Sequence, residues 1–172
     1  MFSTRLFSTH SQKQWSVLSA NTIAFAGNFA VWTLFSILGI QIKQDLGLTD
    51  TQFGVLIATP ILTGSLSRLP LGILTDIFGG RRVFTILMLC IVPAIYSINL
   101  ATAYWHYLVI GLFVGLAGGS FAVGIAYTSA WFDKDRQGTA MGIFGAGNAG
   151  AAITNLAAPL LIVAYGWESV PT

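Results

Sequence analysis

Long uncharged stretches dominate the pattern of polar and apolar positions. Uncharged residues run without interruption from Gln14 to Ile42 and again from Val83 to Trp131. A helix needs roughly 20 predominantly apolar residues to cross a bilayer, so the first stretch is long enough for one crossing and the second must turn once. We place this turn at residues 97–106, where polar residues meet Tyr104 and Trp105, as expected at a membrane interface.

This pattern predicts an all-α integral membrane protein. Five transmembrane helices are expected at about residues 17–40, 52–75, 83–101, 107–132 and 138–165, after a separate N-terminal segment 1–14. Transmembrane β-strands are about 10 residues long and alternate in polarity, whereas these segments are apolar on all sides. A β-barrel is therefore excluded.

Composition narrows the class further. Hydrophobic residues make up 55% of the 172, and charged residues only 8%, against roughly 25% in soluble domains. This excludes a soluble enzyme, and a net charge of +2 without a dense basic block excludes a nucleic-acid binder. The single cysteine and the two separated histidines offer no metal site, so we expect neither metal nor cofactor.

The distribution of cations predicts the orientation. With the N-terminal segment in the cytoplasm, six cations lie inside: Arg5, Lys13, Arg81, Arg82, Lys134 and Arg136. Lys43 then lies outside, together with Asp45, Asp50 and Glu168. This asymmetry follows the positive-inside rule.

Arg68 is the one charged residue expected within a membrane helix. It precedes Asp76 by eight residues, which puts its Cα about 12 Å inside the apolar layer. An arginine there costs at least about 2.5–3.5 kcal/mol, and no acidic residue lies in any expected helix interior. Either its side chain extends to the inner interface, or it faces a polar cavity and binds an anion in two-point fashion.

Glycines at spacings of four, counted from Arg68 in the first case and from one another in the others, mark three of the expected helices. They are Gly64 and Gly72 on either side of Arg68, then Gly111, Gly115 and Gly119, then Gly138 and Gly142. Such spacing is typical of faces where membrane helices approach closely.

Four asparagines lie well inside the expected helices. Asn21, Asn28 and Asn155 are expected to bridge helices. Asn148 differs, because it lies within Gly145-x-Gly147-x-x-Gly150, where small neighbours leave its amide open to a ligand. That spacing also occurs in dinucleotide-binding folds, but those need a preceding strand, and this segment has helical length.

The segment from Gly72 to Arg82, G-I-L-T-D-I-F-G-G-R-R, resembles the signature of the major facilitator superfamily. Ile77 and Gly80 depart from it, while Gly72, Asp76, Gly79, Arg81 and Arg82 match. The resemblance implies a latch, in which Asp76 and the arginines clasp neighbouring helix ends in one transport state and release them in another. Alternatively, the arginines serve only to fix topology.

Within that superfamily, the chain resembles the nitrate/nitrite porters of the plasma (bacterial inner) membrane. The likeness lies in Ser67-Arg68-Leu69-Pro70, in Gly118-Gly119-Ser120-Phe121-Ala122, and in the stretch from Gly145 to Gly150 with the following Asn155-Leu-Ala-Ala-Pro159. It implies that Arg68 binds substrate, that Phe121 is a pocket aromatic, and that Asn148 lies near the substrate among the signature glycines Gly145, Gly147 and Gly150.

The resemblance implies that these helices correspond to most of an N-terminal six-helix bundle, so the expected partners are nitrate or nitrite, the bilayer, and a C-terminal half or a partner chain. Two alternatives remain open at this point. The chain could belong to a facilitator for another small anion or an organic acid, or it could be a non-transporting assembly subunit or truncated fragment.

Overall fold

The structure, a computed structural model, describes the backbone of residues 2–166 and the side chains of residues 11–166. All regular secondary structure in the described part is helical: α1 (Phe2–Leu46), α2 (Asp50–Phe78), α3 (Gly80–Tyr96), η1 (Ser97–Leu100), α4 (Tyr104–Gly115), η2 (Leu116–Gly119), α5 (Ser120–Trp131), α6 (Lys134–Gly145), η3 (Ala146–Asn148) and α7 (Ala149–Tyr165). The three η segments are 3₁₀ turns, and two of them join α4 to α5 and α6 to α7 into longer rods.

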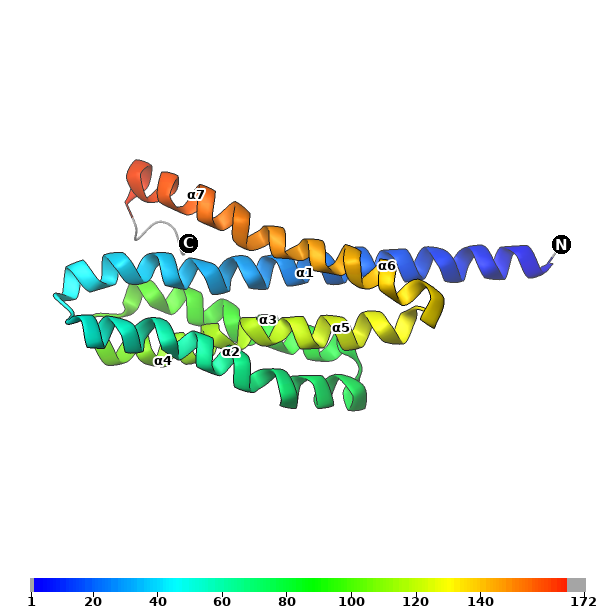
Figure 1. Ribbon diagram of the computed structural model, residues 1–172, viewed down its shortest axis with the longest axis horizontal. Coiled ribbons are helices and arrows are strands. Elements are labelled where there is room, and N and C mark those ends of the chain that lie inside the picture. The colour runs from blue at the N-terminus through cyan, green and yellow to red at the C-terminus, as the bar shows by residue number, and fades with distance from the viewer. Residues whose placement is uncertain (1, 167–172) are drawn as a thin grey trace.

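Five rods run up and down along one axis (Figure 1). The α2–α3 and α5–α6 turns lie at the end where α1 begins, and the α1–α2 turn lies at the opposite end with the end of α7. Within the described range, five segments are long and apolar enough to cross a membrane. The five predicted membrane helices are therefore confirmed, and the chain is an integral membrane protein.

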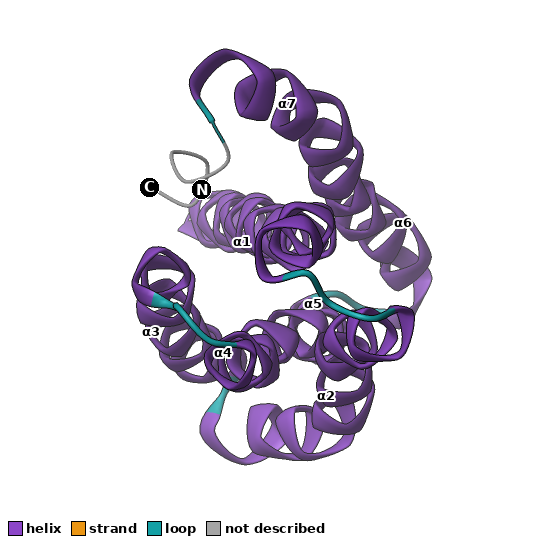
Figure 2. Cartoon of the chain, turned by 90° about the vertical axis from the view of Figure 1, so that its left-hand side faces the viewer, coloured by secondary structure: helices purple, strands orange, loops and turns teal. Residues whose placement is uncertain are grey.

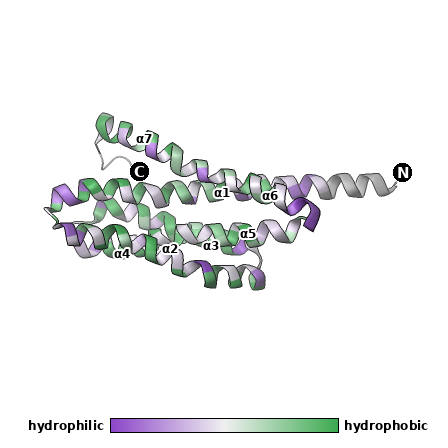
Figure 3. Cartoon of the chain, viewed as in Figure 1, coloured by the Kyte–Doolittle hydropathy of each residue, from purple (hydrophilic) through white to green (hydrophobic). Residues whose placement is uncertain are grey.

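Many large apolar side chains point outward. Leu69, Leu156 and Val163 are 73%, 74% and 88% exposed, and apolar residues cover the rods along most of their length (Figure 3). Buried apolar residues form two clusters, one containing Phe25 and Phe144 and the other Phe35 and Tyr107. Such an exposed apolar surface suits lipid or another membrane segment rather than water.

The first helix is longer than the prediction. It begins at Phe2 instead of 17, so residues predicted as a separate segment 1–14 lie in the same helix. Hydropathy marks only the part of a helix that suits lipid, and no glycine or proline before Gly27 stops the helix from extending beyond it. The side chain of Arg5 and all of Glu168 lie outside the described residues.

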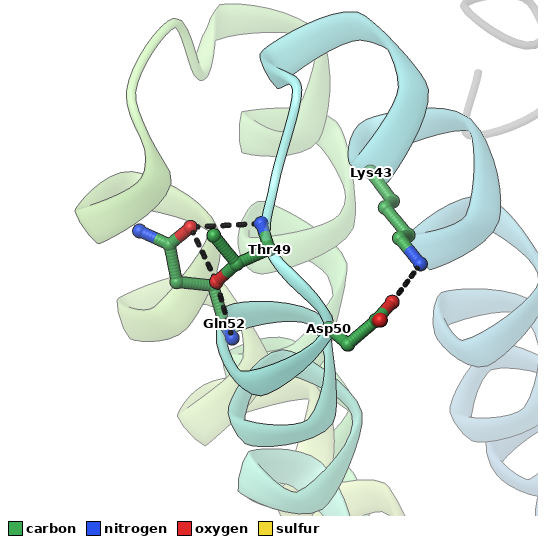
Figure 4. A network of polar contacts seen from close by, with 4 residues as sticks. All are labelled: Lys43, Thr49, Asp50 and Gln52. Carbon is green, nitrogen blue, oxygen red and sulfur yellow. Dashed lines mark hydrogen bonds and ion pairs between the residues drawn. The ribbon is translucent and has the colours of Figure 1, made fainter.

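Polar contacts hold the α1–α2 turn in place (Figure 4). Gly47 has a φ of +59°, which ends α1 in a conformation that favours glycine. Thr49 then caps α2, because its side chain accepts from the backbone N–H of Gln52 at 3.3 Å while the Gln52 side chain accepts from the Thr49 backbone N–H at 3.0 Å. Across the turn, Lys43 Nζ lies 2.6 Å from an Asp50 carboxylate oxygen.

The α4–α5 rod packs closely against α2, and the α6–α7 rod packs closely against α1. The α2 rod packs on η2, where a Cβ on Gly64 would lie 2.9 Å from the Gly115 carbonyl oxygen and 3.3 Å from Gly118 Cα. Viewed along the rods, α1 lies between α6–α7 on one side and the remaining helices on the other (Figure 2). The expectation that Gly138 and Gly142 form a packing face is not met within the described residues, since both face open space.

Candidate anion-binding site

Arg68 lies in the middle of α2 and is exposed. Its guanidinium carbon lies 5.9 Å from the ring centroid of Phe121, in the first turn of α5. The side chain therefore reaches across to the neighbouring rod. One turn before Arg68, Gly64 gives α2 its close contact with η2, and the adjacent Ser67 is buried with its hydroxyl donating to the Gly64 carbonyl at 3.2 Å. This contact fixes the distance between the helices that carry Arg68 and Phe121.

Phe121 belongs to an aromatic cluster centred on Phe25 of α1. The Phe25 ring is fully buried and lies 5.6 Å from Phe121, 4.7 Å from Phe144 and 5.3 Å from Phe29, measured between ring centroids. Phe29 in turn lies 5.2 Å from Trp32. Sequence reasoning missed this cluster, although the spacing of Phe25, Phe29 and Trp32 puts all three on one helix face.

Asn148 ends the short 3₁₀ segment η3 and is exposed. Its side-chain amide donates one N–H to the Gly145 carbonyl oxygen at 2.8 Å. An amide nitrogen carries two hydrogens, so a second donor stays available to an anion. Asn148 has no described contact with Arg68. It is linked to that residue through packing, because its neighbour Gly147 lies against Phe25, which contacts Phe121.

The three signature glycines have different surroundings. A Cβ on Gly147 would lie 2.5 Å from Phe25 Cδ1 and 3.0 Å from the Thr22 carbonyl oxygen, and one on Gly150 would overlap the backbone of Ala26. Gly145, in contrast, has nothing within 4 Å of that position. Two of the three therefore let α1 and α7 approach, and this approach determines where Asn148 lies.

Of the other asparagines, one forms the predicted bridge. Asn21 of α1 donates to the Gly124 carbonyl at 2.9 Å and to the Thr128 hydroxyl at 2.7 Å, both on α5. Asn28 instead donates to the Ala24 carbonyl of its own helix at 2.7 Å.

The motif between α2 and α3 forms a sharp turn. Gly79 has a φ of +84°, a conformation that favours glycine over other residues. Gly80 packs against the Tyr127 ring of α5, and a Cβ at this position would overlap the ring. The close contact with Tyr127 thus accounts for a glycine at position 80, where the sequence departs from the superfamily signature. Gly72 faces open space. Asp76, Arg81 and Arg82 are all exposed, and the described residues contain no ion pair between them. The clasp inferred for this latch is not formed within the described part of the chain.

Charge is distributed unevenly between the two ends of the bundle. Lys43 and Asp50 form the ion pair found among residues 11–166, at the α1–α2 turn. The first part of α1 and the starts of α3 and α6 lie toward the opposite end (Figure 1), and they carry five cations with described side chains: Lys13, Arg81, Arg82, Lys134 and Arg136. Arg68 lies between the ends and has no carboxylate partner among the described side chains. An anion reaching this level of the bundle would meet an uncompensated guanidinium.

Comparison with known proteins decides the family. The family model of the Major Facilitator Superfamily matches residues 20–171. The chain belongs to the Major Facilitator Superfamily. The fold class and the family predicted from the turn after α2 are thereby confirmed.

Similar proteins within this superfamily are named as nitrate or nitrite transporters. This facilitator chain is 43% identical over 167 residues to the probable nitrate/nitrite antiporter NarK1 of Thermus thermophilus, covering 90% of the chain and 38% of the relative. It is 35% identical over 152 residues to the nitrite extrusion protein of Bacillus subtilis, covering 88% and 38%. It is 34% identical over 152 residues to the probable nitrate transporter NarT of Staphylococcus carnosus, covering 88% and 39%. The chain thus spans about two fifths of the length of the curated relatives it matches.

Proposed function

We propose that this chain takes part in transporting nitrate and nitrite across the plasma membrane by alternating access. The observation that carries the proposal is the position of Arg68, which is exposed at mid-bundle beside Phe121 and has no carboxylate partner in the described chain. The names of the relatives support nitrate and nitrite as substrates. Relatives of this kind extend well beyond the matched region, and alternating access requires a second bundle that rocks against the first.

The chemistry of the site suits a small planar monoanion. A guanidinium supplies a permanent charge and parallel N–H donors, which match two oxygens of a delocalised anion. Phe121 supplies an aromatic face beside the cation from a second rod, and Asn148 supplies an amide donor from a third. Arg68, Phe121 and Asn148 are thus the proposed substrate-binding residues, and Arg68 is the one on which charge recognition depends.

The orientation and the latch belong to the same proposal. The end rich in cations faces the cytoplasm, in agreement with the positive-inside rule, so α1 begins there. Asp76, Arg81 and Arg82 lie at that end and are exposed, which leaves them available to the ends of helices from a second bundle. In this scheme they clasp those ends in one state and release them in the other.

The first test is Arg68→Lys in the protein as it occurs in the membrane, with nitrate uptake into proteoliposomes as the readout. We expect transport to be abolished, because an ammonium keeps the charge but loses the two-point geometry. Arg136→Lys, at an exposed position in the first turn of α6, is the matched control and should transport normally. Uptake by Arg68→Lys at the original affinity would refute the anion site. It would also favour an assembly role, in which Arg68 pairs with a carboxylate of a partner.

Asn148→Ala tests the choice of substrate. Loss of the amide donor should weaken the preference for nitrate over chloride while leaving the fold intact, since Asn148 is exposed and its side chain donates only to the Gly145 carbonyl, three residues earlier. Asn155→Ala, seven residues later and also exposed, is the matched control. An unchanged ratio of nitrate to chloride inhibition in Asn148→Ala would remove Asn148 from the site and favour a facilitator for a different anion.

A further inference from the structure

The two neighbouring arginines at the start of α3 border different grooves. Arg81 borders a groove of about 630 Å³ between α1, α3 and α5, and Arg82 borders one of about 350 Å³ between α2 and α3. Successive residues of a helix point about 100° apart, which explains the divergence. Both side chains are exposed and neither has an ion pair with a described residue. The arginine pair is therefore not a single cationic patch.

The α2–α3 groove is apolar apart from its mouth. Its walls come mainly from six residues: Leu71, Leu74 and Phe78 of α2, and Val83, Ile86 and Leu87 of α3. Leu74, Phe78 and Ile86 are 39%, 54% and 61% exposed, so these walls are open to the surroundings of the bundle. Arg82 is the only charged residue that lines the groove.

The length of the groove along α3 is close to the thickness of one leaflet. Cys90 also lines it and follows Arg82 by eight residues of α3, which is about 12 Å along the helix. The hydrocarbon core of a bilayer is about 30 Å thick, so one leaflet contributes about 15 Å. A molecule filling this groove meets a cation at the surface of the membrane and apolar side chains over most of one leaflet.

Two neighbouring grooves of the described residues lack this combination. The groove that Arg81 borders also contains Lys13, but its walls carry the polar residues Ser16, Asn21 and Thr85, which are unfavourable for a hydrocarbon chain. The groove between α3 and α4, about 520 Å³, is lined by no Lys or Arg.

We propose that the α2–α3 groove binds an anionic phospholipid of the cytoplasmic leaflet, of the phosphatidylglycerol type. Its phosphate contacts Arg82, and one acyl chain lies against Leu74, Phe78 and Ile86. Charge complementarity argues for an anionic headgroup, since the mouth offers one unpaired guanidinium, and basic pockets between helices on the cytoplasmic side recognise such lipids. The assignment of the leaflet rests on the proposed orientation, but the lipid site does not depend on which anion is transported.

The test measures retention of phosphatidylglycerol and phosphatidylcholine by native mass spectrometry of the intact membrane protein. Arg82→Gln should lower the affinity for phosphatidylglycerol about fivefold, the equivalent of about 1 kcal/mol for one cation at the membrane surface, and leave that for phosphatidylcholine unchanged. Arg81→Gln is the matched control, because it removes the same charge from the neighbouring groove and should leave phosphatidylglycerol binding unaltered. Equal losses in both variants would refute the site, as would equal retention of the two lipids by the original protein.

A second variant tests the apolar part without changing charge. Ile86→Trp fills the groove from an exposed position, so it should fold and should also reduce retention of phosphatidylglycerol. Glycerol phosphate, which carries the headgroup charge without acyl chains, should not displace the lipid. Full retention by Ile86→Trp, or displacement by glycerol phosphate, would overturn the proposal. Ile86→Trp decides the matter if Arg82→Gln fails to fold.

Discussion

Gly150 offers a sharp test of the contact between α1 and α7. A Cβ at this position would overlap the Ala26 carbonyl oxygen and would lie 2.8 Å from Ala26 C and 3.0 Å from Ala26 Cα. These are backbone atoms of a helix, so the clash cannot be relieved by rotating a side chain. Gly150→Ala must therefore push the two helices apart. Gly145→Ala, in the same motif, adds its methyl group to open space.

The expected magnitude follows from comparing the two variants. Inserting a methyl group into a packed contact costs about 1–3 kcal/mol. Replacing glycine by alanine in a helix gains about 0.5–1 kcal/mol, and this gain applies to both variants and largely cancels between them. Gly150→Ala should thus be about 1–3 kcal/mol less stable than Gly145→Ala.

Thermal unfolding of the purified membrane protein in mild detergent, followed by tryptophan fluorescence, measures this difference. Gly145→Ala should unfold at or slightly above the original temperature, and Gly150→Ala clearly below it. Nitrate affinity should fall only in Gly150→Ala, because Asn148 lies two residues from the displaced contact. If the two variants unfold at the same temperature, the close approach of α1 and α7 is wrong, and with it the distinction between the signature glycines.

Three further predictions concern the turns and the helix contacts, each measured by the same unfolding assay. Thr49→Ala removes the cap of α2 and should cost about 1 kcal/mol, with unchanged unfolding as the contradicting result. Trp32→Phe keeps an aromatic ring but loses the smaller ring of the indole and its hydrogen bond from Nε1 to the Pro60 carbonyl at 3.3 Å, and the loss of the hydrogen bond should cost about 0.5–1.5 kcal/mol. A variant as stable as the original would show that this bond contributes nothing. Gly79→Ala forces alanine to a φ of +84° and should cost about 1–3 kcal/mol, whereas a neutral effect would mean that the α2–α3 turn has another conformation.

The sequence predicted the number and order of membrane helices because the cost of placing charge in lipid leaves a strong pattern. It predicted their ends less well. The interface does not stop a helix, so α1 continues to Leu46, where Gly47 ends it. The 3₁₀ turns at η2 and η3 were also missed. They follow Gly115 and Gly145, and η2 lies where Gly118 meets Gly64 of α2, so this conformation depends on a contact distant in sequence.

Part of the proposed site follows from the sequence alone, and part from the structure. Arg68 is proposed from the sequence because a cation within a membrane helix is costly, and Asn148 because glycines surround it. The different surroundings of Gly145 and Gly150 were not identifiable, since spacing alone does not tell which side of a helix another helix will cover. Gly80 shows the same limit, because only the position of the Tyr127 ring explains it.

The electrostatics of Arg68 explain why an apolar bundle retains this residue. A guanidinium at membrane depth costs at least about 2.5–3.5 kcal/mol, while an exposed contact with an aromatic ring such as Phe121 contributes about 0.5–1 kcal/mol. The contact with Phe121 is therefore too weak to offset the cost. No described carboxylate pairs with Arg68, so the rest of this cost must be offset by water, by an anion or by a group from another segment. Binding an anion at this position offsets that cost through the attraction between the two charges. A residue that serves only packing would have no such gain, and this difference makes Arg68 the best-supported part of the proposed transport site.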